Sequence, residues 1–224
     1  KEPYNVAAAN PAAEVGTLTA ALKASRAQVV VAFAVPAFMA LLRLSELSLG
    51  YSPQLVSSSV GSDPITLSGL LDSFAKKSGT FGTSLIQGTI TDSYLPSLGS
   101  GDSWIKLFTK IHNEYIPKLP LDGNVLYGMS VAYTFVQALF KAGRNPTRQD
   151  LVNAVNAGLP QGVSVAPYAY SSTDHDGITG AYIAEIENGV LVPLGPVQVT
   201  DNTPTGAVTT YTTAQPPAPS SGIP

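Results

Sequence analysis

The stretch from residue 18 to residue 59 constrains the fold more than any other part of the chain. Leu18, Ala21 and Leu22 fall on one face of a helix, and Gln28 precedes the apolar run VVVAFAV. Because this run does not alternate with polar residues, it is typical of a strand covered by helices on both faces. A second helix and a second apolar strand follow. This order predicts a βαβ unit within a parallel sheet, and therefore an α/β fold.

Pro36 and Gly50 set the limits of the second helix. Proline suits the first helical turn, where an N–H group has no partner, and glycine suits the left-handed residue that ends a helix. The next strand is expected at residues 54–58. In open α/β sheets, ligands bind beyond the carboxyl ends of the strands. The candidate ligand-binding residues at these ends are Ala34, Val35, Ser57, Ser58 and Ser59.

The three serines also have an ordinary structural explanation. A serine run after a strand is common loop composition and often caps the helix that follows. The position at a strand end favours binding, whereas the residue type alone fits either interpretation.

Composition limits the kinds of partner. The 224 residues are 44% hydrophobic and 12% charged, which is enough to bury a sizeable core in one domain or in two lobes. The net charge of -3 comes from 12 Lys and Arg against 15 Asp and Glu, so we expect no nucleic-acid partner. The lack of cysteine excludes disulfides, thiolate metal sites and cysteine nucleophiles.

Helix and strand signals continue along the chain. Asn10, Asp63 and Thr147 are typical helix N-caps, and Asn188-Gly189 is a strong hairpin signal. The helix at 124–142 is apolar nearly all round, so we expect it to be buried. The expected elements are a weak strand at 3–9, helices at 11–24, 36–49 and 64–77, a strand at 83–91, helices at 104–115, 124–142 and 148–158, and strands at 181–187 and 190–193.

No residue pattern predicts catalysis. Asp174, His175 and Asp176 are residue types that bind metals, but adjacent residues cannot all point at one ion, so an Asx-rich turn explains them better. The S-x-x-K sequence at 73–76 lacks the partner motifs of penicillin-binding enzymes, and no G-x-S-x-G elbow is present. His112 is expected to be a surface or capping group. We expect no enzyme activity, no metal and no cofactor.

Four phrases carry a resemblance to a known family. They are LKASRAQVVVAFAVPAF, LSLGYSPQLVSSSVG, DGNVLYGMSVAYTFVQALFKAG and SSTDHDGITGAYIAEIENG. In order and spacing they resemble the type 1 periplasmic binding proteins, specifically the branched-chain amino acid (Leu/Ile/Val) substrate-binding family of ABC transporters. The resemblance implies parallel-sheet, Rossmann-like lobes and covers only the latter part of such a protein. We therefore expect the fold to be incomplete at its N-terminus.

The resemblance also implies a division of the chain. The family chain crosses its hinge three times, so we expect four parts: residues 1–95 as the main part of the second lobe, 96–179 as the returning part of the first lobe, 180–199 as strands of the second lobe, and 200–224 as a Pro/Thr/Ser-rich tail. Because the tail lacks periodicity, we expect it to be disordered or to wrap around the protein.

Two positions depart from the amino-acid binders of this family. Val35 stands where they tend to place a ring or polar group, and Ser59 stands where they place a glutamate that pairs with the ligand ammonium. The hypothesis that follows is a neutral or anionic ligand, unless the absent lobe or another acid such as Asp92 supplies the charge. Tyr127 resembles the cleft aromatic of the family's return helix, although its helical spacing also fits a core ring.

The resemblance implies an extracellular solute-binding protein of an ABC importer. Such a protein holds a small molecule, here amino acid-like or a small organic or aromatic acid, between two lobes and presents it to a membrane permease. We expect an extracellular or periplasmic location, with a signal peptide and lipid anchor in the precursor. The alternative is the ligand-sensing domain of a receptor or regulator. The chain is expected to dimerise or to pair with its missing N-terminal part.

Overall fold

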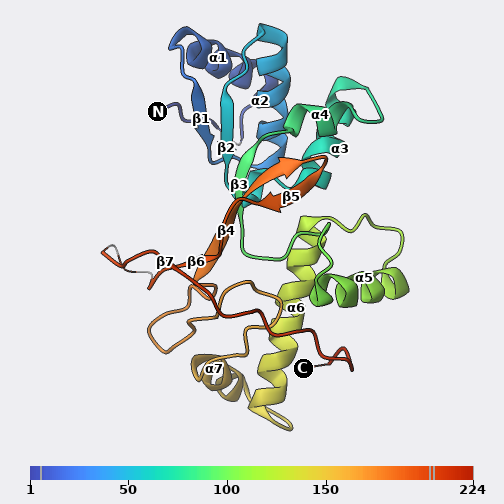
Figure 1. Ribbon diagram of the computed structural model, residues 1–224, viewed down its shortest axis with the longest axis vertical. Coiled ribbons are helices and arrows are strands. Elements are labelled where there is room, and N and C mark those ends of the chain that lie inside the picture. Colours follow the sequence, from blue (N-terminus) through green and yellow to red (C-terminus); the bar gives the residue numbers. More distant parts are fainter. Residues whose placement is uncertain (6, 202, 204, 224) are drawn as a thin grey trace. The chain divides into compact units, whose positions relative to one another are not determined.

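The chain divides into two units in the computed structural model, which describes residues 1–5, 7–201, 203 and 205–223 (Figure 1). The first unit comprises Lys1–Asp92 and Ala184–Val192, and the second unit comprises Ser93–Ile183 and Pro193–Pro224. Whether these units are the lobes expected from the sequence stays a prediction.

The helices and strands alternate in the first part of the chain, as an α/β fold requires. In chain order they are α1 (Pro11–Ala24), β1 (Val29–Ala32), α2 (Pro36–Leu49), β2 (Gln54–Ser57), the 3-10 helix η1 (Ser59–Gly61), α3 (Pro64–Ala75), α4 (Phe81–Ile86), β3 (Ile90–Ser93), α5 (Ser103–Tyr115), α6 (Gly123–Ala142), α7 (Arg148–Asn156), β4 (Gly180–Glu187), β5 (Val190–Pro193), β6 (Gln198–Val199) and β7 (Thr209–Thr210).

The predicted βαβ unit is confirmed in the first unit. Strands β1 and β2 are parallel, with Ala32 opposite Ser57, and β3 runs parallel to β2 on its other side. Pro36 occupies the first turn of α2, and Gly50 ends that helix in the left-handed conformation with φ 59°. The carboxyl ends of β1, β2 and β3 therefore meet at one edge of the sheet.

The expected burial of β1 on both faces is wrong. Val30 belongs to the core, but Val29, Val31 and Phe33 on the other face are 52%, 60% and 76% exposed. Helices α1 to α4 contribute to a core that meets only one face of this strand. The apolar run predicted a buried strand, but burial depends on neighbours that the run itself does not specify.

The expected strand at 83–91 is also wrong in its first half. Residues 81–86 form α4, and only Ile90–Ser93 form β3. Gly82 lets α4 lie directly against α3, since a Cβ atom there would stand 2.2 Å from the Ser68 carbonyl oxygen. Gly88, with φ 78°, then turns the chain into the strand. Tertiary packing has overridden a short, ambiguous apolar pattern.

The weak strand expected at residues 3–9 is absent among the described residues there, and Val6 lies outside them. The Ala8 N–H donates to the Asn5 carbonyl oxygen at 3.1 Å, which forms a turn instead. Helix α1 then begins as predicted, because the Asn10 side chain accepts from the Ala13 N–H.

The core of the second unit is aromatic. Trp104 and Phe108 of α5 pack with Tyr133 of α6, and the rings of Trp104 and Tyr133 meet edge to face at 4.9 Å. The N-cap of α5 is Asp102, whose side chain accepts from the Trp104 N–H. The predicted cap at Thr147 is confirmed, as a full capping box with Asp150.

The expected burial of α6 on all sides is wrong. Leu126 and Tyr133 are buried, but four large apolar side chains along the helix are about half exposed. These side chains are Tyr127, Val131, Phe135 and Phe140. Spacings of four residues between the first three put them on one face of the helix.

The C-terminal segment wraps around the second unit over its described residues, so the wrapping alternative is confirmed. The Trp104 indole N–H donates to the Pro216 carbonyl oxygen at 2.7 Å, and the Ala218 N–H donates to the Ser103 hydroxyl at 2.9 Å. The Gln215 amide donates to the Val163 carbonyl oxygen at 2.6 Å. The Pro/Thr/Ser-rich tail is thus hydrogen-bonded to α5 and to the 163–164 loop.

Two further predictions have opposite outcomes. The β4–β5 hairpin is confirmed, and Asn188 and Gly189 both have positive φ, 51° and 80°, as its two-residue turn requires.

His112 is not a surface group, since it is buried and its Nε2 lies 2.9 Å from the Leu119 carbonyl oxygen. That contact holds the chain that leaves α5.

Candidate functional site

The predicted residues at the strand ends lie together in the first unit. We call Ala34, Val35, Ser57, Ser58, Ser59 and Asp92 the strand-end cluster. Ser57 stands opposite Ala32 in the β1–β2 register, and the Ser59 N–H donates to the Asp92 Oδ1 at 2.9 Å. Asp92, on β3, is the carboxylate of this cluster.

The three serine hydroxyls are not equivalent. Ser57 is buried, and its hydroxyl donates to the Ser58 carbonyl oxygen at 3.1 Å. Ser58 and Ser59 are half-buried, and among the described residues neither hydroxyl has a hydrogen-bond partner. Ser58 and Ser59 are therefore better placed than Ser57 to contact a bound molecule.

Three backbone N–H groups of the cluster, those of Val35, Ser58 and Ser59, are already used inside the protein. The Val35 N–H donates to the Tyr4 hydroxyl at 3.1 Å, and the Ser58 N–H donates to the Ala32 carbonyl oxygen at 3.4 Å. The Gly61 N–H donates to the Ser58 carbonyl oxygen at 3.0 Å. The cluster thus offers oxygen atoms and two hydroxyls, but few unused backbone donors.

Gly61 allows the strand ends to pack closely. A Cβ atom at this position would lie 2.4 Å from the Ala34 carbonyl oxygen and 2.8 Å from Met39 Cγ. Below the cluster, the buried hydroxyls of Ser62 and Thr91 lie 2.5 Å apart. The cluster is therefore held by close packing on a satisfied polar layer.

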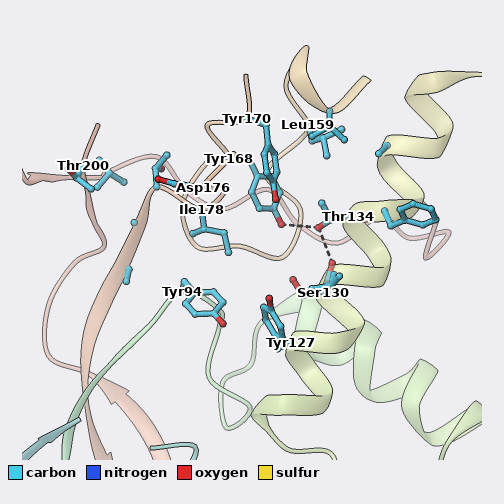
Figure 2. A pocket seen from close by; sticks show the side chains of 18 of the residues that line it. Tyr94, Tyr127, Ser130, Thr134, Leu159, Tyr168, Tyr170, Asp176, Ile178 and Thr200 are labelled. Atoms are coloured by element: carbon cyan, nitrogen blue, oxygen red, sulfur yellow. Dashed lines mark hydrogen bonds between the residues drawn. The ribbon is translucent and has the colours of Figure 1, made fainter. Parts of the chain in front are cut away.

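A hollow of about 840 Å³ lies within the second unit (Figure 2). Its volume is in the range of small-molecule sites, and its wall is mostly apolar and aromatic. Tyr127, Val131 and Phe135 reach it from the exposed face of α6. Residues from 94 to 208 line it, so we call it the second-unit cavity.

Three of the polar residues that line the second-unit cavity are connected by hydrogen bonds. The Thr134 hydroxyl donates to the Ser130 carbonyl oxygen at 2.9 Å and lies 3.0 Å from the Tyr168 hydroxyl, as Figure 2 shows. Since Thr134 has one proton to donate, Tyr168 is the donor in the second bond. Burial raises the pKa of Tyr168, so its phenol stays protonated. Tyr94 and Tyr127 form an edge-to-face pair at 6.1 Å.

The predicted site residues therefore fall in two places. Ala34, Val35 and the three serines lie in the strand-end cluster, whereas Tyr127 lines the second-unit cavity. Sequence reasoning did not predict this cavity, because its wall comes from segments far apart in the chain. The available signal was the four-residue spacing of the apolar face of α6.

The Asp174 to Asp176 run forms the Asx turn that the sequence favoured. The Asp176 N–H donates to the Asp174 Oδ1 at 2.9 Å, and the Asp174 N–H donates to the Ser171 hydroxyl at 3.0 Å. Within the described ranges, no group of three or more His, Asp or Glu side chains is placed to hold a metal ion. Nor does any helix in the described part of the chain have the length and apolar character to cross a membrane.

Comparison with solved structures shows the fold. A branched-chain amino acid ABC transporter from Thermus thermophilus with bound valine matches with a TM-score of 0.68 at 17% identity, over 83% of this chain and 49% of that one. A fatty acid ABC transporter substrate-binding protein from Thermomonospora curvata matches with a TM-score of 0.66 at 22% identity, over 83% and 46%. This chain has the fold of the type 1 periplasmic binding proteins. The resemblance expected from the sequence is thereby confirmed at the level of fold.

A third match is an extracellular ligand-binding receptor from Verminephrobacter eiseniae, with a TM-score of 0.62 at 16% identity, over 81% of this chain and 49% of that one. The chain thus spans about half the length of the structures it matches. These neighbours are described as transporter components, binding proteins or receptors rather than enzymes. No protein-family model and no curated protein matches the sequence.

Proposed function

We propose that this protein is a solute-binding protein of an ABC importer, which captures a small molecule outside the cytoplasm and delivers it to a membrane permease. The observation that carries the proposal is the fold match to substrate-binding proteins of ABC transporters. In this role the protein binds and releases its ligand without changing it chemically.

The residues that we propose to contact the ligand are those at the strand ends and the exposed ring of α6. Ala34, Val35, Ser57, Ser58 and Ser59 meet where ligands bind in open α/β sheets, and this geometry supports the proposal. Tyr127 is half exposed and lines an apolar hollow, which supports a role in covering an apolar ligand body.

A ligand panel tests the proposal. The protein would be heated with leucine, valine, benzoate, an aliphatic carboxylate and the corresponding amides, and the midpoint of unfolding recorded. We expect one chemical class to raise the midpoint saturably, because a ligand that binds only the folded state stabilises it. No saturable stabilisation by any class, or turnover of the amides, would contradict the proposal.

The second candidate is a ligand-sensing domain of a receptor or regulator, which the match to an extracellular ligand-binding receptor favours. The same fold hosts both roles, so the fold alone does not choose between them. Intact mass and N-terminal sequencing of the protein isolated from its own cells would distinguish them. A lipid-modified N-terminus favours transport at the cell surface, and a membrane-spanning or DNA-binding segment favours sensing.

The association state stays a prediction. The half-exposed face of α6 supports self-association or pairing with a further N-terminal segment, since Val131 and Phe135 are both 51% exposed. Light scattering measures it directly, and a monomer that binds no hydrophobic dye would count against the expectation.

A further inference from the structure

We propose that the second-unit cavity binds a neutral aromatic molecule that carries a hydroxyl group, and that this hydroxyl donates a hydrogen bond to Tyr168. The site goes beyond the proposed function, because no residue of the strand-end cluster lines the cavity. It is a second binding site, and all the residues that line it belong to the second unit.

The first argument is the number of rings in the wall. Tyr94 and Tyr127 meet edge to face at 6.1 Å, and the rings of Tyr168 and Tyr170 lie 5.5 Å apart (Figure 2). Phe135 adds a ring from α6, and its side chain is half exposed. Aromatic rings attract one another beyond the effect of buried area. A volume of about 840 Å³ suits a ligand with two or more rings.

The second argument is the charge of the wall. Among the described residues that line the cavity there is no Lys, Arg or His, and Asp176 is an acid. The hydroxyls of Tyr127 and Tyr170 can donate hydrogen bonds, but a buried carboxylate without a cation keeps most of its desolvation cost. Asp176 is exposed, so a cation paired with it would stay in water. The cavity therefore suits a neutral ligand.

The third argument is the direction of the hydroxyl protons. The Thr134 hydroxyl donates to the Ser130 carbonyl oxygen at 2.9 Å, so the Tyr168 hydroxyl, 3.0 Å from it, must donate to Thr134. Burial raises the pKa of Tyr168 against the opposing hydrogen bonds with the side chains of Thr134 and Ser130, which keeps the phenol neutral. Its proton is used within the protein, but its oxygen can still accept. A ligand O–H group meets this oxygen favourably, and an ether oxygen does not.

The test uses three probes with the same pair of rings: 2-naphthol, 2-methoxynaphthalene and 2-naphthoate. The naphthol can donate a hydrogen bond, the methoxy compound cannot, and the naphthoate is charged. Equilibrium dialysis at neutral pH would give their dissociation constants for the wild-type chain, for Tyr168→Phe and for Tyr115→Phe. Tyr115→Phe is the matched control, because it removes the same hydroxyl from an exposed residue of α5 that does not line the cavity.

We expect 2-naphthol to bind about tenfold more tightly than 2-naphthoate, and Tyr168→Phe to weaken naphthol binding by about threefold to tenfold. Binding of 2-methoxynaphthalene should be the same in wild type and Tyr168→Phe, and Tyr115→Phe should change none of the three constants. Naphthoate binding as tight as naphthol binding, naphthol binding insensitive to Tyr168→Phe, or no binding of naphthol would overturn the proposal. Each of these results leaves the proposed function standing, because that function rests on residues of the strand-end cluster.

Discussion

The strand-end cluster and the second-unit cavity are built in opposite ways. The strand-end cluster of the first unit is small and polar, and most of its hydrogen-bonding groups already have partners within the protein. The second-unit cavity has a volume of about 840 Å³ and a wall of rings and aliphatic groups with a single connected set of hydroxyls. Size alone favours the cavity as the binding site, whereas chemistry favours the cluster. Volume provides area for contact, but a few oriented polar groups decide which ligand binds.

The cores of the two units also differ, in residue type and in how completely they are buried. The first unit buries aliphatic side chains completely, including Met39, Leu67 and Leu71 at 0% exposure. The second unit is organised around the rings of Trp104 and Tyr133, while α6 keeps an exposed apolar face. Side chains near the candidate site of the first unit are therefore tightly packed, whereas the side chains around the second-unit cavity are packed less tightly.

The largest expected effect tests the close packing of the first unit. Gly61→Ala would place a Cβ atom 2.4 Å from the Ala34 carbonyl oxygen, so we expect a loss of about 2–3 kcal/mol in the free energy of unfolding. Urea unfolding followed by circular dichroism measures it. The matched control is Gly69→Ala in α3, where nothing lies within 4 Å and helix propensity predicts a small gain. Equal effects of the two variants would refute the packing argument.

The next effect tests whether the C-terminal segment stabilises the second unit. Removing residues 212–224 deletes the bonds of Gln215, Pro216 and Ala218 to the rest of the unit. At about 0.5–1.5 kcal/mol for each bond, we expect the second unit to lose about 2 kcal/mol. Fluorescence of Trp104, the sole tryptophan, reports on this unit. Truncation after Ser220 is the control, and it should leave the transition nearly unchanged.

A smaller effect separates the cavity from the cluster. Tyr168→Phe removes the hydroxyl that lies 3.0 Å from Thr134, so we expect a loss of about 1 kcal/mol in stability. The same change should not alter binding of the panel compound that raises the unfolding midpoint most, because Tyr168 lies outside the strand-end cluster. Thermal unfolding and calorimetry on the same sample measure both quantities. Weaker binding of that compound by this variant would place the ligand in the cavity rather than at the cluster.

The smallest effect concerns the pH dependence of the first unit. Burial raises the pKa of Glu46 above its usual 4.5, against the opposing effect of its ion pair with Arg43. The folded state thus binds the proton more tightly than the unfolded state, so stability from this group increases as pH falls from neutral through the raised pKa. Glu46→Gln removes this dependence. Urea unfolding at several pH values should show that the free energy of unfolding of the wild type rises relative to that of the variant as pH falls. A constant difference between the two proteins would contradict the assignment of a raised pKa to Glu46.

Local signals predicted much of the fold because they act through neighbouring residues. Pro36, Gly50 and the Asn188-Gly189 pair set helix and hairpin limits that depend only on backbone conformation. Burial was harder to predict, since the exposure of Val31 on β1 and of Phe135 on α6 depends on which elements lie beside them. The same limit explains α4, where contact with α3 decided the conformation of an ambiguous segment.

The candidate site was predictable only in part. The rule that ligands bind at strand ends identified Ser57, Ser58 and Ser59 from the sequence. It did not show that the Ser57 hydroxyl is used within the protein, or that Asp92, 33 residues further along, reaches the Ser59 N–H. Such pairings depend on the register and direction of side chains on neighbouring strands, which periodicity does not give.

The central claim is that the ligand binds at the strand-end cluster, and its most direct test is a map of where the ligand binds. Amide proton and nitrogen shifts of the labelled protein would be followed during titration with the panel compound that raises the unfolding midpoint most. Ser59 reports on the strand-end cluster, and Thr134 reports on the second-unit cavity. Because the Ser59 N–H donates to Asp92, its signal should move saturably, and the signal of Thr134 should stay unchanged. Movement confined to Thr134 and its neighbours in the second-unit cavity would contradict the account.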